Sequence, residues 1–229
     1  MIVFYTTDIL GDIATLHASE SKHCNVVLRK KPGDQVNIID GKGLFATGIV
    51  LSQTKNTTSI QIETSEIFDV RLHLGIAICP TKNMNRFEFF LEKATEIGIN
   101  NIYPILCARS ERKILKAPRL EKILLSAAKQ SVNYHLPILH PLQTFKNFTK
   151  QLKGSPIEKF IGHYKPDNPD LFSTIGNESE KLVVIGPEGD FTDEELILAS
   201  ESGFTQVNLS KSRLRTETAG IVASTFICA

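Results

Sequence analysis

From about residue 70 onward, short apolar runs alternate with longer segments whose apolar residues recur at helical spacing. These segments read as strand 72–79, helix 86–97, strand 101–106 and helix 118–131. Gly98 is well placed to end the first of these helices, and Pro118 to begin the second. Alternation of this kind predicts a mainly parallel sheet with helices on its faces.

The first 70 residues follow a different pattern, with short β-rich runs and polar breaks. The runs are 36–39, 44–51 and 59–63, separated by Gly41-Lys42-Gly43 and the polar tract 53–58. That spacing predicts a small barrel. One helical segment is expected to interrupt it and to end at Leu28, with Ser19 or Ser21 as its N-cap. The change of pattern predicts a domain boundary near residue 70.

Two strand–loop–helix units follow one another between Leu182 and Ala219. The apolar run 182–185 is a predicted buried strand, which Gly186-Pro187-Glu188-Gly189 must end. Thr192 and Glu195 form a capping-box signature for the next helix, which Gly203 is expected to end. A second predicted strand, 206–209, leads through 210–215 into a final helix that begins near Thr216.

The loops after these two strands carry the candidate chemistry. Arg213, Arg215 and Glu217 stand beside a helix start, where unpaired backbone N–H groups can receive a carboxylate or phosphate. Gly186 to Gly189, taken alone, could be only a tight turn. Because ligands of open α/β sheets bind at the carboxyl ends of strands, two such loops predict one composite pocket.

Composition excludes several classes of protein. A chain of 229 residues with 41% hydrophobic residues can fill one large or two modest cores. The four cysteines form no CxxC pair, so we expect reduced, mostly buried thiols and neither a zinc ribbon nor a disulfide framework. The N-terminus does not resemble a signal peptide and no apolar stretch reaches membrane-spanning length, so a cytoplasmic protein without membrane contact is expected.

A net charge of +1 argues against binding nucleic acid through overall basicity, but local basic clusters remain. The clusters are Arg29-Lys30-Lys31; Arg109, Arg112, Lys113, Lys116, Arg119 and Lys122; and Lys211, Arg213 and Arg215. Each cluster taken alone is better interpreted as a solvated face. His135 and His140 flank Pro137 and share no helical face, so no metal site is expected.

The residues Gly186-Pro187-Glu188-Gly189, then Leu209, then Leu214-Arg215-Thr216-Glu217-Thr218-Ala219, resemble the cofactor-binding signature of the SPOUT methyltransferases. The ribosomal RNA small subunit methyltransferase E family is the most similar member. Further matches run along nearly the whole chain: His23 with Val27-Leu28-Arg29, the segment 87–98, Ser110-Glu111-Arg112, and Gln130 ahead of Pro137.

This resemblance implies an α/β protein with an N-terminal PUA-like β-barrel, residues 1–70, that binds RNA. Residues 71–229 would form a SPOUT α/β domain with a deep trefoil knot, which carries the cofactor site and part of a homodimer contact. The implied activity is S-adenosylmethionine-dependent methylation of N3 of a specific uridine in 16S rRNA of the small ribosomal subunit. Periodicity alone would not have predicted a knot.

The resemblance also implies roles for individual residues. The cofactor-binding residues would be His163, Ile185, Gly186, Pro187, Glu188, Gly189, Leu209, Ser210, Leu214, Thr216, Thr218 and Ala219. Arg215 would stabilise the uracil oxygens as N3 loses its proton. Glu217 would orient that arginine or accept the proton, unless it is only a carboxylate favoured by the helix N-terminus. The RNA-binding candidates are Arg29, Lys30, Arg109, Arg112 and Arg213.

The chain departs from the family pattern at several positions. Asp190 stands where a third loop glycine is usual, Ser210 replaces a glycine, and Ser212 stands where arginine is frequent. Lys129 and Asn133 also differ from the usual residues. A second hypothesis, from another class, is a non-catalytic RNA-binding or ribosome-assembly protein that retains the fold, although the intact Gly186, Gly189, Arg215 and Glu217 argue against it. A nucleotide hydrolase is remote, because no GxxxxGK[ST] loop follows any predicted strand.

Overall fold

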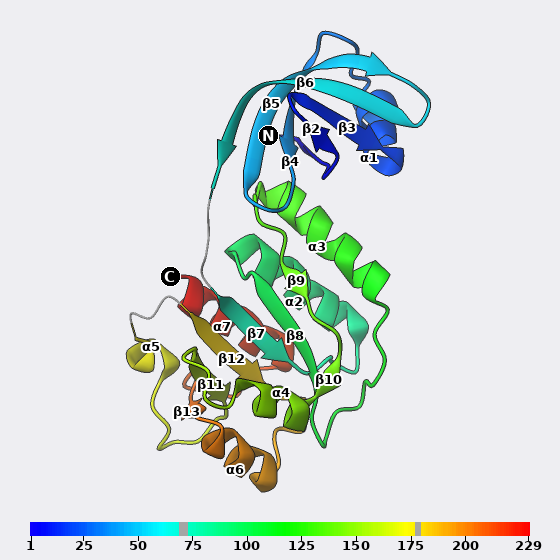
Figure 1. The fold of residues 1–229 in the computed structure, drawn as a ribbon. Helices are drawn as coiled ribbons and strands as arrows, with labels where there is room; N and C mark the ends of the chain where they lie inside the picture. Colours follow the sequence, from blue (N-terminus) through cyan, green and yellow to red (C-terminus); the bar gives the residue numbers. More distant parts are fainter. Residues whose placement is uncertain (69–72, 177–179) are drawn as a thin grey trace. The chain divides into compact units, whose positions relative to one another are not determined.

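The computed structural model describes residues 1–68, 73–176 and 180–229 (Figure 1). The chain forms two compact units, one of Met1–Arg71 with Leu125–Leu136 and one of Leu72–Leu124 with Pro137–Ala229. The boundary predicted near residue 70 lies outside the described residues. Division into domains 1–70 and 71–229 stays a prediction, and the compact units differ from it by assigning residues 125–136 to the first.

The first unit is built on a six-stranded sheet in the order β1-β4-β5-β6-β3-β2. The strands are β1 Val3–Tyr5, β2 Ile9–Leu10, β3 Ile13–His17, β4 Gln35–Ile39, β5 Leu44–Gln53 and β6 Thr57–Ile67. β1 pairs with β4 in parallel and the other pairs are antiparallel. Phe4, Leu16, Ile38 and Ile60 are buried in its core. The predicted β-rich region is confirmed, while its closure into a barrel stays a prediction.

The helical segment of this unit differs from the prediction at its start. Helix α1, Ala18–Lys22, continues directly from β3 with His17 as N-cap, and a π-helical segment η1, His23–Val27, follows. The prediction of Ser19 or Ser21 as the cap was wrong. Ser21 is instead buried, with its Oγ 2.8 Å from Thr58 Oγ1 on β6, because the helix begins without a loop and packs on the sheet.

The second unit is built on a parallel sheet in the order β10-β8-β7-β12-β11-β13, with β9 also paired to β8. The strands are β7 Leu74–Ile78, β8 Asn101–Leu106, β9 Ile138–Leu139, β10 Gln143–Thr144, β11 Glu158–Gly162, β12 Lys181–Ile185 and β13 Thr205–Val207. Every residue of β7 is buried, as expected for an apolar strand covered on both faces. The predicted parallel sheet is confirmed, although residue 72 of the first predicted strand lies outside the described residues.

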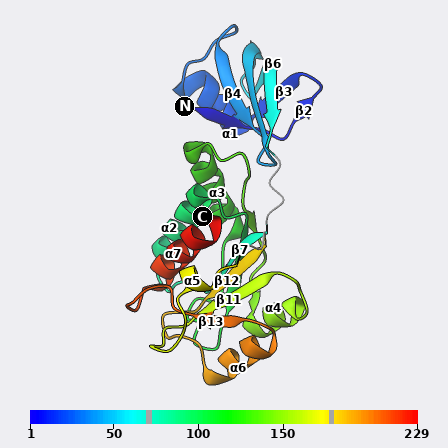
Figure 2. The ribbon, with the colours of Figure 1, turned by 90° about the vertical axis from the view of Figure 1, so that its left-hand side faces the viewer.

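Helices cover both faces of this sheet (Figure 2). They are α2 Met84–Ile97, α3 Ala117–Ser131, α4 Phe145–Leu152, α5 Leu171–Thr174, α6 Asp193–Glu201 and α7 Thr216–Cys228. Helices α2 and α7 lie together, and Gly220 permits their close approach because an added Cβ would lie 2.7 Å from the Phe90 ring. Phe145 and Phe148 of α4 pack with Leu196 of α6 in a second core.

Three helix ends agree with the sequence-based predictions. Gly98 is the C-cap of α2 in the left-handed conformation, with φ +112°. Thr192 and Glu195 form a complete capping box at the start of α6, and α7 begins at Thr216. β13 ends at Val207, so Leu209 lies in a loop and not in the predicted strand.

Candidate functional site

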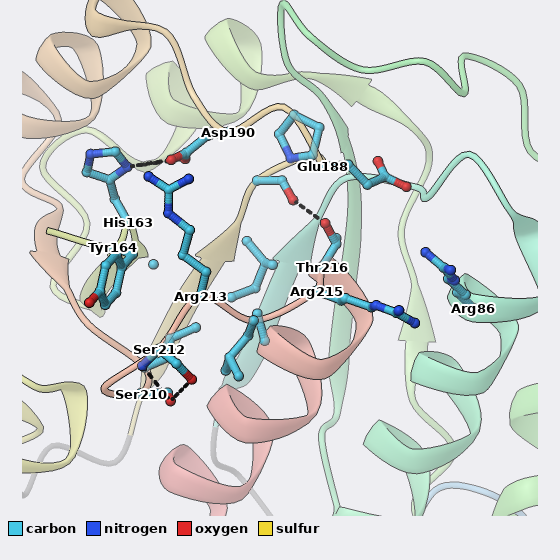
Figure 3. Close-up of a pocket in the computed structure, with 17 residues that line it drawn as sticks. Arg86, His163, Tyr164, Glu188, Asp190, Ser210, Ser212, Arg213, Arg215 and Thr216 are labelled. Carbon is cyan, nitrogen blue, oxygen red and sulfur yellow. Dashed lines mark hydrogen bonds and ion pairs between the residues drawn. The ribbon is translucent and has the colours of Figure 1, made fainter.

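Three neighbouring strands end together at one edge of the parallel sheet. Gly162, the last residue of β11, is in register with Ile185 of β12 and Val207 of β13. The loops that follow enclose a cavity of about 420 Å³ (Figure 3). Its lining residues are Arg86, Gly162, His163, Tyr164, Ile185, Gly186, Pro187, Glu188, Asp190, Leu209, Ser210, Ser212, Arg213, Leu214, Arg215, Thr216 and Ala219. The composite pocket expected from two loops therefore has contributions from four segments of chain.

The cavity has apolar surfaces formed by Ile185, Leu209, Leu214 and Ala219. Gly162 permits close packing beside them, because a Cβ there would lie 3.0 Å from Leu209 Cδ1. These surfaces lie beside the backbone groups of the loops. A flat aromatic base with polar edges would find both apolar contact and hydrogen-bonding groups in such a cavity.

The loop after β12 is a tight turn that is tied to the start of α7. Asp190 N donates to Pro187 O at 3.0 Å, and Asp190 adopts the left-handed conformation with φ +62°. Thr216 Oγ1 donates to Gly186 O at 3.1 Å. The loop that begins at Gly186 is thus both a tight turn and part of the cavity wall.

Asp190 and His163 form a contact between the loops after β12 and β11. His163 Nδ1 lies 3.1 Å from Asp190 Oδ1, and the same oxygen accepts from Phe191 N at 2.8 Å. His163 Nε2 is buried and has no hydrogen-bond partner among the described residues. The departure at position 190 therefore replaces a glycine with a side chain that holds both its own turn and a neighbouring histidine.

Arg215 is the N-cap residue of α7 and extends into the cavity. In the described parts of the chain its guanidinium has no hydrogen bond or ion pair. Glu217 does not pair with it. The side chain of Glu217 is 9% exposed. Its Oε1 lies 3.6 Å from Nε of Arg86, whereas its Oε2 has no partner in the described ranges.

Ten of the twelve cofactor-binding candidates line the cavity, and Gly189 and Thr218 do not. The carbonyl oxygen of Gly189 instead accepts a hydrogen bond from Arg109 Nη1 at 2.7 Å. Thr218 is exposed on α7. The structure therefore brings together most of the predicted set, and the roles of its members stay predictions.

The RNA-binding candidates are dispersed. Arg29 has φ +53° and Lys30 Nζ donates to Gln35 O, both in the first unit. Arg109 donates to Gly189 O and Phe191 O, and Arg112 Nη2 donates to Lys82 O at 2.9 Å. Only Arg213 of this set lines the cavity. Lys129, a departure from the family pattern, forms an ion pair with Glu20 at 2.6 Å.

Arg86 and Tyr164 line the cavity but were not among the predicted site residues. Tyr164 directly follows the predicted His163, so its position in the sequence could have indicated that it lines the cavity. Its hydroxyl donates to Lys211 O at 3.3 Å. Arg86 lies in the first turn of α2, after β7. It reaches the site because β7 is paired with β12, a strand order that no local pattern reveals.

The described residues contain neither a cluster of metal ligands nor a membrane-spanning helix. No group of three or more His, Cys, Asp or Glu side chains there is arranged to hold a metal ion. No helix in residues 1–68, 73–176 or 180–229 is long and apolar enough to cross a membrane.

Comparison with known families finds two matches. The family described as RNA methyltransferase domain matches residues 69–228, and the family described as RNA methyltransferase PUA domain matches residues 18–63. Among curated proteins, ribosomal RNA small subunit methyltransferase E of Mesomycoplasma hyopneumoniae is 35% identical over 153 residues, which cover 65% of each chain. The Synechocystis protein of that name is 28% identical over 97% of this chain and 75% of its own length.

Solved structures extend the similarity to the whole chain. A probable rRNA-methyltransferase from Porphyromonas gingivalis has a TM-score of 0.90 at 32% identity, covering 99% of this chain and 97% of that one. A ribosomal RNA small subunit methyltransferase E from Neisseria gonorrhoeae, bound to S-adenosyl methionine, has a TM-score of 0.85 at 28% identity, covering 98% and 95%. Both compact units of this chain thus have counterparts in solved structures.

Proposed function

Because this chain belongs to the RNA methyltransferase domain family, we propose that it transfers the methyl group of S-adenosylmethionine to N3 of a uridine in 16S rRNA. The resemblance to ribosomal RNA small subunit methyltransferase E stated from the sequence is confirmed by the family and by its curated relatives. The specific uridine and the assembled state of the ribosomal substrate belong to the proposal.

The observation that carries the proposal is the cavity at the ends of β11, β12 and β13. Its apolar surfaces fit the adenine, and the backbone of Gly186, Ser210 and Leu214 is available for hydrogen bonds to the base and ribose. The Neisseria relative, similar over almost the whole chain, is bound to S-adenosyl methionine. The residues present therefore fit this cofactor.

When bound, S-adenosylmethionine supplies a methyl group on a sulfonium, and the C–S electron pair stays with sulfur as the new N3–C bond forms. The task of the chain is to hold N3 in line with that methyl group and to exclude water. The N3 proton must leave before or during transfer, which places negative charge on the uracil oxygens. Arg215, which lines the cavity and has no hydrogen-bond partner among the described residues, would stabilise that charge.

Further features of the proposal rest on the family resemblance. They are a PUA-like barrel that contacts RNA through Arg29 and Lys30, a deep trefoil knot in the C-terminal part, a homodimer and a cytoplasmic location. Arg112 and Arg213 would add phosphate contacts, which set position more than sequence.

The second hypothesis is an RNA-binding or ribosome-assembly protein that retains the fold without methylating. Gly186, Gly189, Arg215 and Glu217 are all intact, and the cavity beside them is not filled by side chains of the described residues. A protein that had lost the reaction would have no need to keep a cavity lined by Arg215, so we favour the enzyme.

Titration calorimetry with S-adenosylmethionine tests the proposal first. Wild type should bind it, and Leu214→Trp, which fills the cavity, should lose binding. Ile197→Trp, at an exposed position of α6, is the matched control, and ATP is the control ligand. Arg215→Ala should bind the cofactor as wild type does.

A transfer assay then measures labelled methyl groups incorporated into unmodified small ribosomal subunits, followed by nucleoside analysis for N3-methyluridine. Arg215→Ala should transfer more slowly in spite of normal cofactor binding. A wild-type protein that ignores the cofactor would instead make the RNA-binding hypothesis the leading one.

A further inference from the structure

Arg86 approaches the cavity from a different strand–helix unit than Arg215 does. It lies in the first turn of α2, whose N-cap Asn83 accepts from Asn85 N, and Arg86 N donates to Asn83 O at 3.0 Å. Figure 3 shows the side chains of Arg86 and Arg215 at the same side of the cavity, away from Arg213. The Arg86 side chain is 41% exposed.

Glu217 forms an ion pair with Arg86 and does not itself line the cavity. A carboxylate that is 9% exposed needs compensation for its lost hydration. The first turn of α7 supplies part of it, and the Arg86 guanidinium, whose Nε lies 3.6 Å from Oε1, supplies another part. This ion pair directs the Arg86 side chain while its terminal nitrogens make no hydrogen bond with the described residues.

Glu188 is the other carboxylate at this side of the cavity. Its Oε1 accepts from Lys82 N at 3.0 Å, which ties it to the loop between β7 and α2. Glu188 therefore has a partner of its own, and Arg86 is held by Glu217 alone among the described carboxylates.

The uracil ring sets a geometric requirement that one arginine does not meet. N3 lies between the two carbonyl groups, so a guanidinium that spans both oxygens would stand in the plane where the methyl group must arrive. Two guanidinium groups, each on one oxygen, stabilise the anion and leave the N3 lone pair free. Arg86 and Arg215 are two such groups on different segments of the chain.

We infer that Arg86 is a second arginine that contacts the reacting uracil, and that Glu217 is a positioning residue that holds Arg86 and not the base that accepts the N3 proton. This inference rests on the proposed function. The N3 proton passes to solvent water before transfer. The N3 lone pair then bonds to the methyl carbon, and the C–S pair returns to sulfur.

A double-mutant cycle with Arg86→Ala, Glu217→Gln and the double variant tests this inference. Loss of Arg86 should lower kcat by about 10²–10³-fold, the range for one donor to a developing anion, with unchanged affinity for S-adenosylmethionine. Glu217→Gln should lower kcat less, and the double variant should be no slower than Arg86→Ala. If Glu217 were an independent base, its effect would multiply with that of Arg86→Ala, and the inference would be wrong.

Controls separate folding from chemistry. Glu194→Gln changes an exposed first-turn carboxylate of α6 and should leave kcat unchanged. Arg86→Lys keeps a charge beside Glu217, so it should fold like wild type and still lose most of kcat. Thermal unfolding of each variant identifies any that fails to fold.

The outcomes also separate this inference from the proposed function. If wild type transfers methyl groups and Arg86→Lys and Arg86→Ala have the same kcat as wild type, the inference is wrong and the proposed function stands. Absence of transfer by wild type would overturn the proposed function.

Discussion

Arg109 Nη1 donates to the carbonyl oxygen of Gly189 at 2.7 Å, and the same nitrogen lies 3.2 Å from Phe191 O. Glu195 Oε1 accepts from Ala108 N at 2.8 Å beside this contact. The loop after β8 therefore holds the loop after β12, which forms one wall of the cavity. Arg109, predicted to bind RNA, has a structural contact that composition and charge did not suggest.

Removal of the Arg109 side chain should weaken cofactor binding. Charge-assisted hydrogen bonds of this kind are worth roughly 1.5–3 kcal/mol, so Arg109→Ala should raise the Kd for S-adenosylmethionine by about ten-fold or more. Calorimetry measures this, with Arg112→Ala as the matched control. If Arg109 instead contacts a phosphate, the cofactor Kd will be unchanged and the salt dependence of RNA binding will lose about one unit of slope.

Substitutions of Asp190 should differ in stability according to whether the new residue tolerates a positive φ. Asp190 has φ +62° and accepts from Phe191 N through Oδ1. Asp190→Ala loses this bond and keeps the left-handed strain, so it should cost about 1–2 kcal/mol of unfolding free energy. Asp190→Gly loses the bond but relieves the strain, and should cost less. Urea unfolding measures both, and an alanine variant as stable as the glycine variant would contradict the account.

The buried thiols should react slowly in the native protein. Cys79 Sγ and Cys107 Sγ lie 3.3 Å apart, and their hydrogen bond together with burial raises the pKa of Cys107 far above its ordinary value. Burial also raises the pKa of Cys228 to about 11. Iodoacetamide at pH 8 should therefore modify the native protein slowly and the urea-unfolded protein quickly, because only the thiolate reacts.

Cys228 is the partly exposed member of the four free cysteines and should be the first to react in the native state. Mass spectrometry of labelled peptides identifies the order. Modification of Cys107 ahead of Cys228 would contradict the burial that the structure assigns to it.

Stability should fall on mild acidification. Burial lowers the pKa of His73, against the nearby Glu180, and burial together with His73 lowers the pKa of His140. The unfolded chain then binds protons at a pH where the folded protein does not. The free energy of unfolding should therefore decrease as the pH drops below about 6.5 and level off below the folded pKa values.

Urea unfolding at several pH values measures this effect. The ring of His140 stacks on Tyr103 with 3.9 Å between ring centroids, and its Nε2 lies 3.0 Å from Asn101 Oδ1. These contacts surround the His140 imidazole with other side chains. A His73→Gln, His140→Gln double variant should lose much of the dependence below pH 6.5. An unchanged slope would assign the effect to other groups.

Local sequence signals accounted for several helices and strands and for some of their ends. Gly98 ends α2 in the left-handed conformation, and Thr192 with Glu195 caps α6, because both depend on residues within one turn. The prediction of a cap at Ser19 or Ser21 was wrong, since α1 continues directly from β3 and Ser21 packs against β6. Local rules fail where tertiary packing uses the same side chain.

The sequence by itself determined the parallel α/β architecture, the two loops at strand ends and the family to which they belong. Only the tertiary structure decided which distant groups meet: Arg86 with Glu217, Asp190 with His163, and Arg109 with Gly189. Periodicity and capping reflect interactions between near neighbours in the chain. Strand order and loop packing depend on contacts between residues far apart in the chain, so the pairs that shape the cavity are visible only in the folded protein.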